Sequence, residues 1–189
     1  MISRALLALI GLAAVSCGPA NSPAADSARF AGATGVLAPE LNRWTVSTRG
    51  IGPLRFGMTT ADIARELGDS TLANIGARSS CGYIRPKKVP RGASLMMSNG
   101  VFVRVNVDSA GVLTDTFIGV GDSEVSILVR NPGRARIESN KYSGPLSHNL
   151  IVTNPTDPGN QMIFETDGRS IQRYRAGTRA AVELVERCG

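Results

Sequence analysis

The chain has 189 residues, of which 42% are hydrophobic, so it is long enough to bury a core and wholesale disorder is excluded. Aromatic residues make up only 5%, which argues against an extended aromatic binding platform, and 21 glycines with 10 prolines favour a turn-rich, strand-rich fold. The formal net charge of +6 permits contact with anionic surfaces or acidic partners.

Residues 1–17 are typical of an export signal. Arg4 supplies the positive charge, and the apolar run that follows is too short to span a bilayer as a helix. The run ends at Cys17 in a pattern that resembles a bacterial lipobox, which predicts a lipid on this cysteine. A lipobox usually has Leu at the position of Ala14, so ordinary signal-peptidase cleavage after Ser16 is the alternative.

The number of cysteines agrees with lipidation. The chain has three cysteines, and a lipid on Cys17 leaves Cys81 and Cys188 as a pair. In an exported protein this pair predicts a disulfide, and its loop of about 100 residues would stabilise the fold by about 4–5 kcal/mol. A zinc site is disfavoured because two cysteines and the lone His148 lack ligand spacing. Export also argues against a nucleic-acid partner.

Residues 18–44 are rich in Pro, Ala, Ser, Asn and Gly, a composition typical of a flexible tether. Trp44, the only tryptophan, opens a short predicted strand over 44–48. It fits a plug of the core better than a ligand platform.

The first unit is expected to span 45–110 and to be organised around a short helix. Leu54 to Phe56 predicts a brief strand. Thr59 is the expected N-cap, with Asp62 in the position of a capping box, and Gly68 is the expected end of the helix. The helix should bury one apolar stripe, formed by Met58, Ile63, Ala64 and Leu67.

A hairpin follows this helix. Residues 81–84 predict a strand, and Asn99-Gly100 between 93–97 and 101–107 is a strong hairpin signal. In the second hairpin strand the alternate valines should share one buried face, opposite Phe102, Arg104 and Asn106.

The loop 85–92 is the best candidate for an interaction patch, because prolines stiffen it and four cations cluster there. They are Arg85, Lys87, Lys88 and Arg91. A merely solvated loop is the alternative, which composition alone favours.

The second unit is expected to span 111–189 and to repeat the first. Asp122 or Ser123 should cap a helix that turns Val125, Leu128 and Val129 to the core, and Pro132-Gly133 should end it. Strands are expected over 134–138, 149–152, 161–165 and 170–175, with a loop over 154–160 and a last strand over 180–185. Gly57 and Gly121 lie 64 residues apart and the two hairpin turns 68 apart, whereas Tyr83 and Tyr142, at 59, fit this spacing least well. Chance recurrence of common helix and hairpin patterns is the alternative to duplication.

Catalytic motifs are sparse. His148 is the only histidine and is expected in a surface loop, no G-x-S-x-G occurs, and the glycines of 119–121 lack a G-K-[ST] continuation. Helix capping explains most carboxylates. The sequence therefore predicts no cofactor and no enzyme activity.

The stretch Gly50 to Gly68 resembles the helix region of the beta-lactamase inhibitor protein fold and of the small lipoproteins of the outer-membrane barrel-assembly machinery. The chain is also similar, over most of its mature length, to uncharacterised bacterial lipoproteins that share the Gly57-Met58-Thr59 helix, the segment 121–124, the hairpin 164–168 and a terminal cysteine. The resemblance implies short helices packed on antiparallel sheets and a non-catalytic binding role.

These observations together predict an α+β lipoprotein of the cell envelope, with two pseudo-repeats and a protein-binding or inhibitor-like function. The expected partner is an envelope protein, with the membrane contacted through the lipid anchor. Binding of an anionic surface polymer or lipid is the first alternative, and an envelope hydrolase that uses His148 is the second.

Overall fold

The computed structural model describes residues 44–73, 75, 80–185 and 188, all of them within one compact unit that spans Ala38–Gly189. The predicted signal with Cys17, and the predicted tether apart from Trp44, lie outside the described residues. In the part of the chain that is described, no helix has the length and apolar character needed to cross a membrane.

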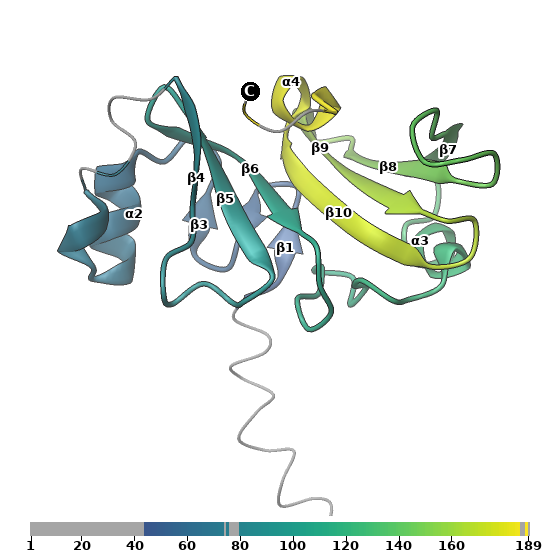
Figure 1. Cartoon of the computed structure of the whole chain (residues 1–189), viewed down its shortest axis with the longest axis horizontal. Coiled ribbons are helices and arrows are strands. Elements are labelled where there is room, and N and C mark those ends of the chain that lie inside the picture. The colour runs from purple at the N-terminus through teal and green to yellow at the C-terminus, as the bar shows by residue number, and fades with distance from the viewer. Residues whose placement is uncertain (1–43, 74, 76–79, 186–187, 189) are drawn as a thin grey trace, which may run out of the picture. The chain divides into compact units, whose positions relative to one another are not determined.

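Two antiparallel sheets make up most of the fold, which confirms the α+β class (Figure 1). The small sheet has the order β1 (Val46–Ser47), β2 (Gly50–Ile51) and β3 (Leu54–Arg55). The large sheet has seven strands in the order β4-β5-β6-β10-β9-β8-β7. Their bounds are β4 Cys81–Ile84, β5 Ala93–Ser98, β6 Val101–Val107, β7 Ala135–Ser139, β8 His148–Asn154, β9 Asp157–Thr166 and β10 Ile171–Thr178.

The helices are short: α2 (Thr60–Leu67), the 3₁₀ turn η2 (Ser70–Leu72), α3 (Glu124–Arg130) and α4 (Arg179–Glu183). For α2 the predicted boundaries are confirmed. The Thr59 side chain accepts from the Asp62 amide, the Asp62 carboxylate accepts from the Thr59 amide, and Gly68 ends the helix with φ 60°. Ile63, Ala64 and Leu67 of the predicted stripe are buried and Met58 is partly buried against the core, because these caps fix where the helix starts and therefore how it is rotated.

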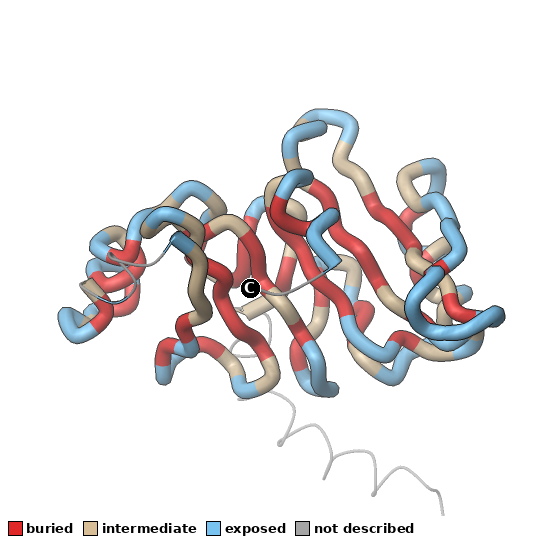
Figure 2. The backbone as a smooth tube through the Cα atoms, turned by 45° about the horizontal axis from the view of Figure 1, so that its top comes forward, coloured by how far each residue is buried: buried red, intermediate tan, exposed pale blue. Residues whose placement is uncertain are grey.

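The main core lies on one face of the large sheet, under α2, α3 and the small sheet. Figure 2 shows buried backbone running along the central strands, with exposed segments in the connections. Trp44 packs against this core, as expected of a plug. On the other face α4 contacts β6, β9 and β10, and its Val182 forms a separate cluster with Ile151 and Ile163.

The predicted orientation of α3 is wrong for Val125 and Val129 but holds for Leu128, which packs against the core. Ile127 is the fully buried residue of this helix, Leu128 is partly buried, and Val125 and Val129 are 62% and 70% exposed. A helix of seven residues has only about two turns, so a single buried position decides its rotation. Apolar character alone could not choose between Ile127 and the two valines.

The predicted last strand over 180–185 is also wrong, because Arg179–Glu183 forms α4. Strand β10 already pairs with β6 on one side and β9 on the other, so the chain that leaves it meets no free strand edge. An alanine-rich segment in that situation satisfies its backbone groups locally, as a helix.

Strand β6 departs from the predicted alternation of faces. The pairing with β5 passes from Met96–Arg104 to Met97–Phe102, which leaves Val103 as an extra, bulged residue. Phe102 therefore faces the main core together with Val105, and Arg104 is buried on the opposite face.

Two connections also differ from the prediction. His148 is the first residue of β8 rather than a loop residue. The predicted loop 154–160 is shorter than expected, since β9 begins at Asp157.

Both longer helices are entered through the same hydrogen-bond pattern. In each case a glycine with a φ near 95° precedes the cap and pairs with the strand that follows a hairpin turn. The bonds are Gly57 N–Phe102 O at 2.8 Å, Phe102 N–Met58 O at 2.8 Å, Gly121 N–Ile171 O at 2.9 Å and Ile171 N–Asp122 O at 2.9 Å.

Candidate binding surface

The loop between β6 and α3 holds an aromatic residue outward in a strained conformation. Phe117 is 55% exposed and has φ 57°, a region that side-chain-bearing residues rarely adopt. The buried Thr114 fixes the loop, since its carbonyl accepts from the Phe117 amide at 2.9 Å and its hydroxyl accepts from the Ile118 amide at 3.1 Å. Backbone strain at an exposed aromatic residue points to function rather than to stability.

The ends of α3 fix its rotation. At the first turn the Ser123 hydroxyl accepts from the Val125 amide at 3.3 Å, and at the last turn Arg130 donates to the Thr116 carbonyl at 3.2 Å. Val125 and Val129 are consequently held outward, one turn apart. Phe117 follows directly after Thr116, the residue that Arg130 contacts.

Leu146, 73% exposed, lies two residues before His148, whose ring contacts the first residue of α3. We refer to Phe117, Val125, Val129 and Leu146 together as the α3 surface. These four large apolar side chains are exposed on α3 and on the two segments that contact its ends, whereas the longest helix, α2, buries most of its apolar stripe.

His148 is engaged in tying α3 to the large sheet. Its Nδ1 atom lies 3.0 Å from both carboxylate oxygens of Glu124, and the buried Thr166 donates its hydroxyl to the same carboxylate. The hydroxyl therefore bonds to the acid and not to the imidazole, whereas an activated nucleophile needs a bond to its base. The contacts position Glu124 and the helix that begins there.

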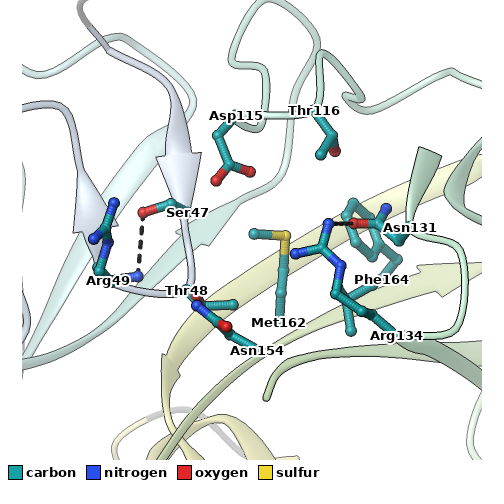
Figure 3. A pocket seen from close by; sticks show the side chains of 11 residues that line it. Ser47, Thr48, Arg49, Asp115, Thr116, Asn131, Arg134, Asn154, Met162 and Phe164 are labelled. Atoms are coloured by element: carbon teal, nitrogen blue, oxygen red, sulfur yellow. Dashed lines mark hydrogen bonds between the residues drawn. The ribbon is translucent and has the colours of Figure 1, made fainter. Parts of the chain in front are cut away.

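A polar pocket adjoins the α3 surface (Figure 3). Val152, Met162 and Phe164 of the large sheet contribute its apolar side chains. Its polar side chains come from four separate segments, namely the β1–β2 region, the loop before Phe117, the segment after α3 and the end of β8. They are Ser47, Thr48, Arg49, Asp115, Thr116, Asn131, Arg134 and Asn154. We refer to this cavity as the Asp115 pocket.

The Asp115 pocket carries charges that are not directly paired. Burial raises the pKa of Asp115, while the nearby charges of Arg134 and Arg49 act in the opposite direction. Within the described ranges no ion pair joins this carboxylate to either arginine. Asn131 is buried and positions Arg134 by accepting its hydrogen bond at 3.0 Å. Polar groups arranged over an apolar floor are typical of pockets that receive an anchoring side chain or a small ligand.

The basic loop lies between β4 and β5, as predicted. Arg85, Lys87 and Arg91 are exposed, and in the described part of the chain none of them forms an ion pair. Lys88 differs, because its ammonium group donates to the Leu67 carbonyl at 2.5 Å. That carbonyl belongs to the last turn of α2, so Lys88 caps the helix and three of the four predicted cations remain available to a ligand.

Cys81 and Cys188 lie at disulfide distance, with their Cα atoms 5.4 Å apart across 107 residues of sequence. Among the described residues, no group of three or more His, Cys, Asp and Glu side chains is placed to hold a metal ion.

The sequence interpretation missed the α3 surface and the Asp115 pocket. No sequence pattern marks Phe117, and the pocket joins segments that are far apart in sequence. Comparison of the chain with models of known protein families, with curated proteins and with solved structures gives no match.

Proposed function

We propose that this chain is a non-catalytic binding module of the cell envelope, anchored through a lipid on Cys17, that recognises a partner protein through the α3 surface. The observation that carries this proposal is the outward orientation of Val125 and Val129 beside the strained Phe117. Apolar side chains at these positions contribute little to the fold, whereas a partner that covered them would gain their burial, about 25 cal/mol per Å² of apolar surface.

The Asp115 pocket completes the proposed surface. It begins at Thr116, next to Phe117, and reaches Asn131 and Arg134 just beyond α3. A partner that covers the apolar residues can therefore place one side chain into the pocket, in the manner of an interface anchor surrounded by a protective rim. The same geometry suits an inhibitor-like role, in which the module blocks a site on its partner.

The module is proposed to consist of two copies of one unit. The matched hydrogen bonds at Gly57 and Gly121 support this idea, as does the order of strands. If β4, β5 and β6 correspond to β8, β9 and β10, the sheet order is symmetric about the β6–β10 pair. In the first unit the corresponding helix, α2, is rotated so that its stripe is buried, which restricts the apolar surface to the second unit.

Affinity purification after chemical crosslinking tests the protein-binding role. We expect one dominant partner that is lost when Val125→Ser and Val129→Ser are combined and is kept in Lys87→Ser, a matched change on the basic loop. A partner retained by the α3 variant and lost from Lys87→Ser would contradict the assignment of the surface.

Binding of an anionic surface polymer or lipid is the second candidate. It is favoured by Arg85, Lys87 and Arg91, which help to line a hollow formed by residues 85–87 and 89–93. These three cations have no ion-pair partner among the described residues. Sedimentation with anionic vesicles should then fall steeply as salt is raised, because exposed charges are screened within about 10 Å at 0.1 M. Binding that does not depend on salt, or no binding, would exclude this candidate. An envelope hydrolase is not favoured, since within the described residues no hydroxyl or thiol group is hydrogen-bonded to the imidazole of His148.

A further inference from the structure

The last described segment of the chain crosses the face of the large sheet opposite α2 and α3. We refer to residues 179–185, which are α4 with Leu184 and Val185, as the C-terminal strap. Its Val182 is fully buried against Ile151 and Ile163, in a small apolar cluster separate from the main core. Figure 1 shows α4 above β9 and β10 at the end of the coloured chain.

Two buried arginines of the sheet hold the strap by its backbone. Arg104 donates from Nη1 to the carbonyls of Ala181, at 2.7 Å, and Leu184, at 3.0 Å. Arg175 donates from Nε to the Val182 carbonyl at 2.6 Å. The last carbonyls of a helix have no partner within it, so the arginines act as a cap supplied by the sheet.

Two hydrogen-bond donors beside the strap have no acceptor in the described structure. Arg104 is 2% exposed, yet its Nε atom has no hydrogen-bond partner in the described structure, and the same holds for the buried Nδ2 atom of Asn106. Both residues line a small pocket bounded by Leu184 and Val185. A buried donor without an acceptor is costly, and two such donors, two residues apart on one strand, call for an oxygen acceptor at that place.

The charges around the pocket favour an anionic acceptor. Three guanidinium groups line it, from Arg104, Arg173 and Arg175, against the carboxylates of Glu165 and Asp108. Glu165 is already engaged, because both Arg173 and Arg175 donate to it. Hydrogen bonds from a guanidinium to a carboxylate are stronger than those to a neutral carbonyl.

We infer that this face is a peptide-binding site that the strap fills in the oxidised chain. The ligand class is a short peptide with an aliphatic side chain in the place of Val182 and a terminal carboxylate that accepts from Arg104 and Asn106. Such a peptide supplies the acceptor that the strap lacks. The site lies on the opposite face from the α3 surface, so it stands independently of the proposed function.

The Cys81–Cys188 bond determines access to this site. The bond ties Cys188 to β4, which keeps the strap at a high local concentration over the sheet. A dithiol reductant opens it: the S–S bond accepts two electrons and two protons to give two thiols, and the dithiol becomes a disulfide. An external peptide then competes with a strap that is held at one end only.

Titration with a peptide of the sequence of residues 179–185 tests the inference. The labelled peptide, with a free terminal carboxylate, is added to the full chain in its oxidised form, after dithiothreitol, and as Cys188→Ser. We expect binding only to the two opened forms, accompanied by faster hydrogen exchange in residues 179–185. The amidated peptide should bind about tenfold more weakly or worse, because it loses hydrogen bonds to a charged acceptor. A peptide with Val182→Asp should not bind.

Asn106→Ala is the variant that locates the terminal carboxylate of the peptide, since it removes one of the two donors that lack an acceptor and does not alter a charge. It should reduce the difference between the free and amidated peptides. The inference is overturned if the oxidised chain binds as well as the opened chain, if neither opened form binds, or if the free and amidated peptides bind equally. If Asn106→Ala leaves the difference in affinity between the free and amidated peptides unchanged, the placement of the carboxylate is also overturned.

Discussion

The rotation of α3 is the structural basis of the proposed binding surface, and two alanine substitutions test it. Ile127 is fully buried in the main core, whereas Val129, two residues along the same helix, is 70% exposed. Ile127→Ala should lower the free energy of unfolding by about 2–5 kcal/mol, because it removes buried methyl groups and leaves a cavity. Val129→Ala should change it by less than about 0.5 kcal/mol, with any gain coming from the higher helix propensity of alanine.

Urea denaturation followed by circular dichroism measures both effects. With a slope of about 2 kcal/mol/M, Ile127→Ala should move the midpoint down by roughly 1–2.5 M, and Val129→Ala should leave it nearly unchanged. A loss of more than about 1.5 kcal/mol in Val129→Ala, well beyond the range of surface substitutions, would show that this valine faces the core. The α3 surface would then not exist, and the proposed function would lose its basis.

Three further predictions concern the disulfide and two carboxylates. Opening Cys81–Cys188, by reduction or by Cys188→Ser, should lower the free energy of unfolding by about 4–5 kcal/mol in the chain-entropy model. Peptide mass spectrometry without reduction should show the two cysteines linked. Free thiols at both positions would refute the disulfide. The Thr59 hydroxyl, which bonds to the Asp62 carboxylate, holds the pKa of Asp62 below its ordinary value of 3.8. Asp62→Asn should therefore be less stable than the wild type above that pH, and the difference should vanish in acid as the pH falls through the lowered pKa; a difference that persists there would contradict the cap. Burial raises the pKa of Asp115, so its ionised form opposes folding, and Asp115→Asn should be more stable at pH 7 but not below pH 3.8 in urea titrations at both pH values. A stability loss at pH 7 would mean that Arg49 and Arg134 more than offset the burial.

Helix α2 could be predicted in full because its boundary residues meet local backbone requirements. Thr59 must supply a side-chain acceptor to a free amide, and Gly68 must adopt φ 60°, so both are visible in sequence. Helix α3 has a cap, Ser123, but no comparable signal for its rotation. Its orientation depends on contacts with Thr116 and His148, and neither contact is local.

The remaining errors share a nonlocal cause. The segment after β10 has a composition that allows strand or helix, and the lack of a free edge beside β10, which is paired on both sides, decides for the helix. The alternating pattern places Arg104 on the face opposite the buried valines, but the bulge at Val103 and the strap together bury it. The Asp115 pocket and the strained Phe117 depend on four segments that meet only in the folded chain.

Site-specific photocrosslinking from position 129 tests the central claim most directly. A photoreactive residue replaces Val129 in the full chain expressed in a bacterial envelope, and the control replaces Glu66, an exposed residue of α2. The proposed function predicts one discrete crosslinked partner from position 129 that is absent from position 66 and is lost when Phe117→Asn is added, a substitution that suits the positive φ. Identical crosslinking from both positions, or none from position 129, would contradict it.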